Sequence, residues 1–416
     1  MMQIAKYSFG IGDRFGNQGK AQLSALIKAK NAGIDIVPVW NKSHREHGIV
    51  GTSPADVRTE ADTSVKALGW EDEYHVDADH INMSNVDGYI DYSDFFTLDV
   101  ADYINEPADE SSVNAFLDSN RKYIGDLKIP GIDQAYKITE EVLKDIAGKY
   151  LFATEQAAAL YRHIAGKKGA DNMIPEVSMD EVADPQTPVE LFFILRMLAG
   201  ENLPLQTIAP KFTGRFNKGV DYEGDVAQFE KEFEEDLLVI EFAIGEFGLP
   251  ENLKLSVHSG SDKFTIYPIM GKLIQKYGKG IHVKTAGTTW LEEIIGLAAA
   301  DGDALQLAKK IYRNAFEKQE ALCAPYATVI DIDFSNLPSP EEVDTWDSRK
   351  YADTLRHIPG HADYNSNFRQ LIHVGYKVAA ELGEEYYSAL KENADVIAQN
   401  VEENIFDRHI KRLFDL

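Results

Sequence analysis

The sequence predicts an α/β fold, a (β/α)8 TIM-type barrel with a helical insertion after its fourth strand and a helical C-terminal extension. Strand-like apolar runs alternate with helix-like segments along the chain, and eight such repeats can be counted. Eight strand–helix repeats close a parallel barrel, and the reactive groups of these barrels lie at the carboxyl ends of the strands. The polar residues that end each run are therefore the candidate functional residues.

The first four strands are predicted from apolar runs with polar ends, IAKYSFGIGDRFG, IDIVPVWN, EYHVDADH and FFTLDVADYI. A helix over residues 18–32 follows the first strand and stops at Gly33, because glycine favours the left-handed conformation that ends helices. A loop with histidine and arginine follows the second strand. The next helix, from about residue 53 to residue 68, has Pro54 in its first turn, where proline is tolerated.

The regular spacing fails over residues 105–169, which contain two or three helices, the clearest over residues 138–165. This is too much chain for one crossover connection. We predict a helical insertion over about residues 105–170, inside a barrel domain that spans residues 1–300.

The last four strands are predicted from MIPEVSMDE, LQTIAPKF, LKLSVHSGSDKF and GIHVKTAGTTW, with helices over residues 188–198, 225–247 and 267–277 between them. The helix over residues 225–247 has the clearest pattern, because apolar residues recur at spacings of three and four. Residues 301–416 are predicted to form a helical extension packed on the barrel, apart from a loop near residues 331–364.

Composition excludes several classes of partner. The chain has 42 basic and 68 acidic residues, a net charge of −26, which argues against nucleic acid or an anionic membrane as a partner. Its single cysteine, Cys323, excludes an internal disulfide and thiolate metal cages. Nothing resembles a signal peptide or a membrane span, so a cytoplasmic protein is expected. The composition is compatible with a homo-oligomer.

Histidines at three strand ends suggest a metal site. His80, His258 and His282 would converge on one barrel mouth, and neutral imidazole is the usual protein ligand of a divalent transition metal. The carboxylates Asp79, Glu176 and Asp180 are then either further ligands or a general acid and base. The alternative is structural: hydrogen-bonded histidines, and carboxylates that cap the following helices.

Several segments resemble the tagaturonate epimerase family: FGIGDRFG, DADH, EVSMDE, GVDYEGDVAQFEKEF, SVHSGSDKFTIYP, HVKTAGT and RQLIHVGY, spread from residue 7 to about residue 377. The resemblance implies a metal-dependent sugar-acid epimerase that interconverts D-tagaturonate and D-fructuronate in hexuronate breakdown. It implies Asp79 as proton acceptor, Glu176 as proton donor, and His80 and His258 as metal ligands. We expect His282 to be the third ligand. The chain departs from the family at residues 212–216, FTGRF, which include Arg215.

The chemistry agrees with these residue types. Inversion at C4 of a 2-ketose can proceed by retro-aldol cleavage of the C3–C4 bond, with a divalent cation (Zn, Mn, Fe, Ni or Co) as Lewis acid and two proton-transfer groups. Lys211, Lys263, Lys284 or Arg14 could hold the substrate carboxylate, and Asp13 and Ser259 are further candidates for substrate binding. Asp79 and His80 are neighbours, so both reach the site only if their strand ends or bulges there.

Two other hypotheses use the same residues. One is a metal-dependent aldolase, or a ketose isomerase or epimerase, that acts on a different sugar. The other is a sugar-binding protein of barrel fold without catalysis, in which a chelating set of histidines would be superfluous.

Overall fold

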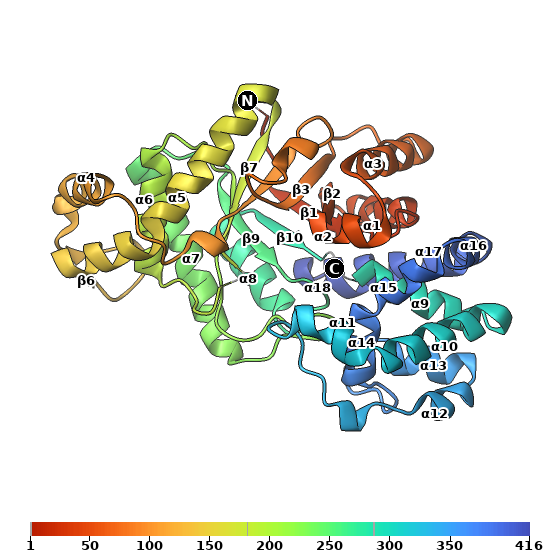
Figure 1. Ribbon diagram of the computed structural model, residues 1–416. Helices are drawn as coiled ribbons and strands as arrows, with labels where there is room; N and C mark the ends of the chain where they lie inside the picture. Colours follow the sequence, from red (N-terminus) through yellow and green to blue (C-terminus); the bar gives the residue numbers. More distant parts are fainter. Residues whose placement is uncertain (1, 181, 286–287) are drawn as a thin grey trace.

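A closed barrel of parallel strands lies at the centre of the computed structural model, which describes residues 2–180, 182–285 and 288–416 (Figure 1). Within these residues the barrel has eight strands in the order β1-β10-β9-β8-β7-β4-β3-β2, and β1 pairs with β2 to close it. The strands are β1 (Tyr7–Gly12), β2 (Val37–Ser43), β3 (His75–Ile81), β4 (Phe95–Asp99), β7 (Ile174–Ser178), β8 (Thr207–Ala209), β9 (Lys254–His258) and β10 (Ile281–Lys284). The predicted fold class and all eight predicted strands are confirmed.

The interior of this barrel changes from apolar to polar along its axis. Val39, Phe95 and Ile174 form an apolar floor with Ile4 of the N-terminal segment. Nearer the carboxyl ends of the strands, the inward side chains of Asp77, Thr97, Glu176, Thr207 and Lys284 are buried and bonded to one another. TIM barrels usually fill this space with Val, Ile and Leu. The half of this interior nearer the carboxyl ends of the strands is therefore polar, and it can take part in chemistry.

The predicted barrel helices are also confirmed. They are α1 (Gly19–Asn31), α3 (Pro54–Leu68), α6 (Pro188–Gly200), α7 (Val226–Phe247) and α8 (Tyr267–Tyr277). A further helix, α9 (Thr288–Ala299), follows β10 and was not predicted. The predicted loop after β2 is wrong, because a short helix, α2 (His44–Val50), begins there. Ser43 and Glu46 form a reciprocal capping box at its start, and this supplies partners for backbone N–H groups that a helix terminus leaves free.

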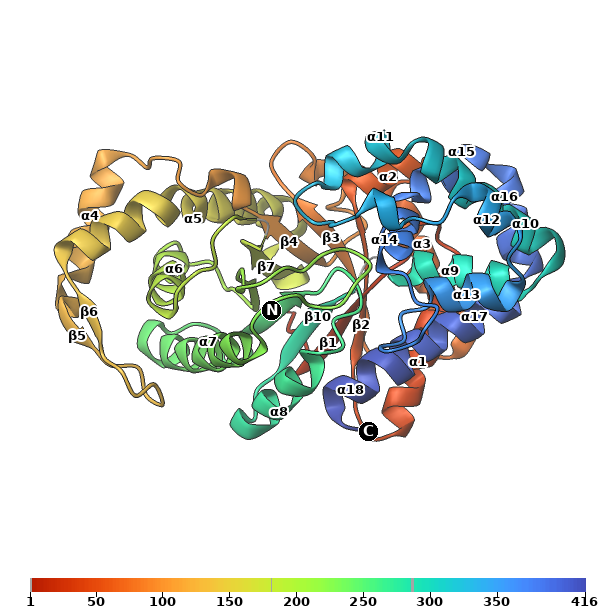
Figure 2. The ribbon, with the colours of Figure 1, turned by 90° about the horizontal axis from the view of Figure 1, so that it is seen from below.

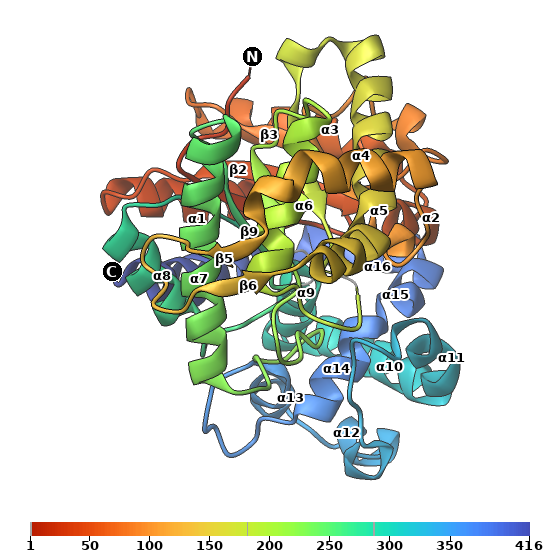
Figure 3. The same ribbon diagram turned by 90° about the vertical axis from the view of Figure 1, so that its left-hand side faces the viewer.

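The insertion between β4 and β7 is not entirely helical. Between α4 (Glu110–Asn120) and the long helix α5 (Glu140–Lys168), two three-residue strands, β5 (Gly125–Leu127) and β6 (Tyr136–Ile138), pair antiparallel. Figures 1 and 2 show α4 and this hairpin on the side of the barrel away from the C-terminal helices. In Figure 3 they face the viewer.

The helical C-terminal extension is confirmed. It comprises α10 (Gly302–Glu317), α11 (Gln319–Cys323), α12 (Pro340–Asp344), α13 (Ser348–Leu355), α14 (Ser366–Val374), α15 (Tyr376–Leu382), α16 (Glu384–Glu392), α17 (Ala394–Glu403), η7 (Asn404–Ile410) and α18 (Lys411–Phe414). The predicted loop near residues 331–364 contains α12 and α13, so that prediction is wrong in part. Among the described helices, none is long and apolar enough to cross a membrane.

Candidate active site

β3 is interrupted at His80, near the mouth of the barrel. The His80 backbone is left-handed, with φ 51°, and the register against β4 shifts between Ala78 and Ile81. In a regular strand Asp79 and His80 would point to opposite faces, and a bulge changes the direction of the following side chain. Asp79 contacts Lys284 and His80 contacts Asp99, so both side chains reach the mouth as predicted.

His80, Asp180 and His258 form a cluster that could hold a metal ion. One potential ligand atom from each lies within 4.8 Å of the other two. The two imidazole rings are 5.1 Å apart, and Nδ1 of His258 is 3.1 Å from Oδ1 of Asp180. Two imidazoles and a carboxylate are a donor set that suits zinc and neighbouring divalent transition metals.

Each imidazole of this cluster is oriented by a second carboxylate. Nε2 of His258 lies 2.8 Å from Oε1 of Glu176, and Nδ1 of His80 lies 3.1 Å from Oδ2 of Asp99. Each ring therefore uses one nitrogen for a carboxylate and keeps the other for the cluster. Metal-binding histidines almost always have such a partner, which fixes the tautomer and the direction of the ring.

The electrostatics of the cluster also suit a cation. Burial opposes a charge on both rings, but the carboxylates of Asp79, Asp99 and Asp180 raise the pKa of His80 to about 10. Asp180 and Glu176 raise the pKa of His258 to about 9 against the same penalty. Nδ1 of His258 is buried, and its one contact among the described residues is the 3.1 Å approach to Asp180, a member of the same cluster. A divalent ion could replace the protons here, since metal ligands must be deprotonated to bind.

Lys284 joins the buried carboxylates beside this cluster. Its ammonium lies 2.7 Å from Oδ2 of Asp77, 2.8 Å from Oδ1 of Asp79 and 3.3 Å from Oε1 of Glu176. Burial opposes the charge on Lys284, but these three carboxylates raise its pKa well above the ordinary value. The ammonium therefore stays charged and fixes the carboxylates around it.

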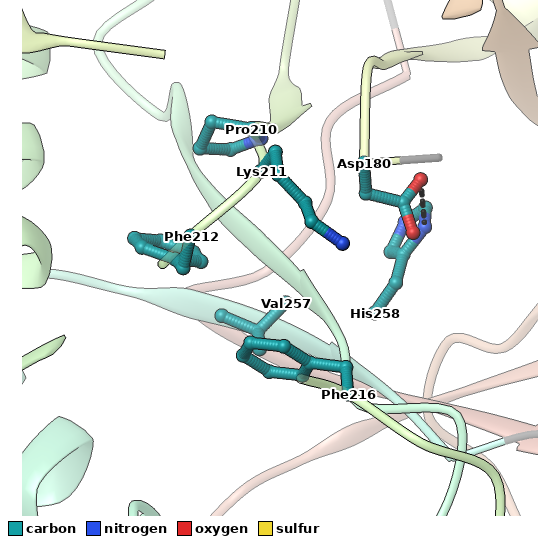
Figure 4. A pocket seen from close by; sticks show the side chains of 7 residues that line it. All are labelled: Asp180, Pro210, Lys211, Phe212, Phe216, Val257 and His258. Carbon is teal, nitrogen blue, oxygen red and sulfur yellow. Dashed lines mark ion pairs between the residues drawn. The ribbon is translucent and has the colours of Figure 1, made fainter. Parts of the chain in front are cut away.

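A pocket opens next to the cluster, with an empty volume of about 260 Å³, part of it open to solvent. Its lining combines two polar members of the cluster with a lysine and apolar side chains: Asp180, His258, Lys211, Pro210, Phe212, Phe216 and Val257. Figure 4 shows the ammonium of Lys211 directed toward Asp180 and His258. The pocket can therefore offer an anionic ligand a cation close to the candidate metal site.

The structure does not bring His282 to the cluster. Its Nδ1 lies 2.9 Å from Oγ of Ser8, and its ring packs 5.1 Å from that of Phe95 at the barrel floor. Burial lowers the pKa of His282 to about 3, so the ring is neutral. The expectation of a third ligand at His282 is corrected accordingly: Asp180 is the third member of the cluster.

Two other expected site residues, in the loop after β9, do not line the pocket. The buried ammonium of Lys263 donates to the carbonyls of Asn217 and Val220, and Oγ of Ser259 donates to the carbonyl of Lys284. Both side chains are therefore occupied by backbone groups. The expectation that they bind substrate directly is corrected.

The expected substrate ligands after β1 are occupied as well. The carboxylate of Asp13 accepts from the backbone N–H groups of residues 15–18 and shapes the turn into α1. Arg14 forms an ion pair of 2.9 Å with Glu46, donates to the carbonyl of His373 and lies 4.0 Å from the Tyr376 ring. Of the four basic candidates for the substrate carboxylate, Lys211 is the one that lines the pocket.

Sequence reasoning missed Asp77, Thr97 and Phe216. Asp77 lies two residues before Asp79, so the alternation of a strand places both on the inner face, and this signal could have identified it. Oγ1 of Thr97 donates to Asp77 and to Glu176, but nothing in its sequence context distinguishes it from a core residue. Phe216 lies in an irregular segment, where no periodicity applies.

The fold and the site define the class of protein as a (β/α)8-barrel enzyme. The mouth of its parallel barrel holds a His–Asp–His cluster and carboxylates bridged by a lysine. Within that class, the chain belongs to the tagaturonate epimerase family, because the family model UxaE, tagaturonate epimerase, matches residues 1–413. The members of this family are isomerases.

Individual relatives agree with this assignment. The chain is 30% identical over 426 residues to the tagaturonate/fructuronate epimerase of Thermotoga maritima, covering 98% of this chain and 80% of that one. A glycerol-complexed crystal structure of fructuronate-tagaturonate epimerase UxaE from Cohnella laeviribosi has a TM-score of 0.80 at 24% identity, covering 99% of this chain and 82% of that chain. Its native form has a TM-score of 0.76. At 24% sequence identity, these two structures support the assignment of the fold alone.

Proposed function

We propose that this protein is a cytoplasmic, metal-dependent epimerase that interconverts D-tagaturonate and D-fructuronate by inverting C4. The observation that carries the proposal is the cluster of His80, Asp180 and His258 beside Asp79 and Lys284 in a chain of the tagaturonate epimerase family. The activity of the Thermotoga maritima relative, as its name gives it, supports the choice of substrate.

His80, Asp180 and His258 would hold the metal, one of Zn, Mn, Fe, Ni or Co. When bound, the cation would supply Lewis-acid stabilisation of the charge that develops on the substrate oxygens. The protein would contribute rigidity, because Asp99 and Glu176 already fix the directions of the two imidazoles.

Asp79 is the proposed proton acceptor. Burial opposes its ionisation, but Lys284 and His80 lower its pKa below the ordinary value, so it is a carboxylate at neutral pH. In a retro-aldol route it takes the proton of the C4 hydroxyl as the C3–C4 bond breaks, and the electron pair of that bond stays on the C2–C3 enediolate. The C4 aldehyde then rotates, the enediolate carbon adds to its other face, and the new C4 alkoxide takes a proton from an acid on that face, which inverts C4.

Glu176 is the residue that the family resemblance implies as proton donor. In the structure it is fully buried, and His258, Thr97, Thr207 and Lys284 surround its carboxylate. Burial raises its pKa, but Lys284 and His258 outweigh this and hold the pKa well below the ordinary value. We propose that Glu176 takes part in proton transfer to the substrate through its contacts with His258 and Lys284.

Lys211 is the proposed ligand of the substrate carboxylate. Arg14, Lys263 and Lys284 are each held by protein groups, whereas Lys211 forms no ion pair with residues 2–180, 182–285 or 288–416. Its ammonium is directed into the pocket beside the cluster (Figure 4). A substrate with a carboxylate at one end and vicinal oxygens at the other could contact both.

The test is epimerase activity with controlled metal content. Chelator-treated protein is incubated with D-tagaturonate and one divalent metal at a time, and D-fructuronate is followed by NMR. We expect no turnover without metal and turnover with at least one of the five metals. The variant His258→Ala should lose both bound metal and activity, because it removes one of two imidazoles from the cluster. Activity that is unchanged after chelation, or metal retained by His258→Ala, would contradict the proposal. Cleavage without epimerisation would favour the aldolase alternative.

A further inference from the structure

The segment over residues 213–223, between β8 and α7, forms one wall of the candidate active site. Phe216 from this segment lines the pocket together with Lys211 and His258. Apart from an isolated bridge between Arg215 and Glu223, the segment has no strand or long helix to hold it. Its position therefore depends on contacts made by other parts of the chain.

Lys263 and Ser261, in the loop after β9, bind the backbone of this segment. The Lys263 ammonium is fully buried and donates to the carbonyls of Asn217 and Val220 at 3.0 and 2.8 Å. Oγ of Ser261 accepts from N–H of Gly219 at 2.9 Å and from the Lys263 ammonium at 3.0 Å. The same loop begins just after His258, so the wall is fixed relative to the metal cluster.

The C-terminal extension also binds the same backbone. Nε of Arg369, in α14, donates to the carbonyl of Gly219 at 2.6 Å, and its Nη2 forms an ion pair of 2.8 Å with Asp262. N–H of Lys218 donates to the carbonyl of Val329, and Arg215 pairs with Asp331. Arg215 belongs to the FTGRF stretch, where the sequence led us to expect a departure from the family, and this stretch lies in the wall.

We propose that Lys263 and Arg369 are positioning residues that hold residues 213–223 as a fixed wall and thereby set the place of Phe216 over the substrate. The C-terminal extension thus completes the substrate pocket of the barrel. This inference rests on the proposed function for its kinetic consequence, but its structural content, a wall held by a buried lysine and arginine, does not.

Lys263→Met and Lys309→Met form a matched pair for the test. The Lys309 ammonium is also buried and also donates to two carbonyls, those of Asp344 and Trp346, but it lies in the C-terminal extension away from the pocket. We expect Lys263→Met to raise KM for tagaturonate about tenfold or more, as for loss of a well-placed apolar contact, with metal content unchanged. Lys309→Met should leave KM unchanged. Equal KM values in the two variants would overturn the proposal.

Limited trypsin digestion gives a second measurement that needs no activity. Arg215 and Lys218 are cleavage sites inside the wall, and the Arg215 side chain is 49% exposed. Release of the wall in Lys263→Met should speed cleavage after these residues about tenfold, since cleavage follows the population of the open form. An unchanged cleavage rate would overturn the proposal whether or not the protein is an epimerase. If Lys263→Met does not fold, Ser261→Ala removes the acceptor of the Gly219 N–H of the wall and should show a smaller acceleration.

Discussion

At the scale of single residues, the site is built from buried charges that hold one another. Lys284 contacts three carboxylates, and each imidazole of the cluster has a carboxylate behind it. Buried ion pairs of this kind add little net stability, but removal of one partner leaves an uncompensated charge. Substitutions that keep shape and change charge are therefore the informative ones.

Glu176→Gln tests the role of the most buried of these carboxylates. The amide keeps a carbonyl oxygen that can accept from Nε2 of His258, so metal content should be retained. If Glu176 takes part in proton transfer, kcat should fall by about 10²-fold or more. Elemental analysis and steady-state kinetics measure both quantities. Glu190→Gln is the control, because Glu190 is also buried but pairs with Lys149 and does not line the pocket. Full kcat in Glu176→Gln would exclude the proton-transfer role.

Lys254 predicts a dependence of stability on pH. Burial lowers the pKa of Lys254 to about 7, below the value of about 10.4 expected for an unfolded chain. Between these two values the unfolded chain binds one more proton than the folded chain, so this residue makes stability rise with pH. The slope is at most about 1.4 kcal/mol per pH unit.

The measurement is the free energy of unfolding of the wild-type protein and of Lys254→Met from pH 7 to pH 10. The difference between the two proteins should grow in favour of the wild type as pH rises, because the methionine has no proton to release. Parallel curves would show that Lys254 keeps its proton in the folded state.

At the scale of elements, β1 needs a residue without a side chain at the position beside Lys284 of β10, so that Lys284 can point into the barrel. A Cβ at Gly10 would lie 2.8 Å from Cγ and 3.2 Å from Cα of Lys284, and 3.0 Å from Nδ2 of Asn41. The first of these distances is closer than real Cβ atoms approach their neighbours. β1 therefore uses glycine where β10 presents its lysine.

Gly10→Ala should displace Lys284 from Asp79 and lower kcat about tenfold or more, since small misplacements of catalytic groups are costly. Gly245→Ala in α7 is the control. Its added Cβ meets nothing within 4 Å, and alanine stabilises a helix interior by about 1 kcal/mol over glycine. Wild-type kcat in Gly10→Ala would mean that the position of Lys284 does not matter for turnover.

The elements show which parts of the fold a sequence reveals. The long helices were predictable because their periodicity extends over many residues, and the eight strands because each is an apolar run with a polar end in a regular strand–helix series. The β5–β6 hairpin, α2, α12 and α13 were not, since they are short and lie outside that series.

Register limited the prediction of the site. His282 and Lys284 share the inner face of β10, but His282 is two residues earlier and thus about 6.6 Å deeper, at the level of the floor. Asp180 lies beyond the end of β7 and reaches His258. The residue types at the strand ends indicated a metal site, whereas the depth of each side chain depends on strand pairing, which the sequence alone does not define.

At the scale of the whole molecule, Asp262 joins the barrel to the C-terminal extension. Its carboxylate contacts Arg369 of α14, His357 of the preceding loop and His409 of η7. All four side chains are buried. The loop that follows the proposed metal ligand His258 is thus fixed to three parts of the extension by the carboxylate of Asp262.

Asp262→Asn should lower the free energy of unfolding by about 3–5 kcal/mol, because it leaves the buried Arg369 without its counter-charge. Asp363→Asn is the matched control. Asp363 pairs with Lys350 on the surface, where both side chains are 40% exposed, and such pairs contribute at most about 1 kcal/mol. Chemical denaturation measures both. Equal effects of the two substitutions would contradict the central position of Asp262.

The whole chain also constrains how a sugar acid is bound. With a net charge of −26, the molecule repels anions at long range, so recognition of a carboxylate depends on local charge such as that of Lys211. Lys211→Met should therefore raise KM for tagaturonate and leave KM for the uncharged sugar tagatose unchanged. Equal changes for the two sugars would assign the carboxylate to another residue.

The most direct test of the proposed epimerisation is NMR of D-tagaturonate turnover by the metal-loaded enzyme in D₂O. If the C3–C4 bond breaks and re-forms, D-fructuronate appears and its C4 hydrogen, which never leaves carbon, stays unlabelled. The result that this account predicts is full epimerisation with protium at C4. Absence of D-fructuronate would contradict the proposed function, and deuterium at C4 at the rate of epimerisation would contradict the retro-aldol route.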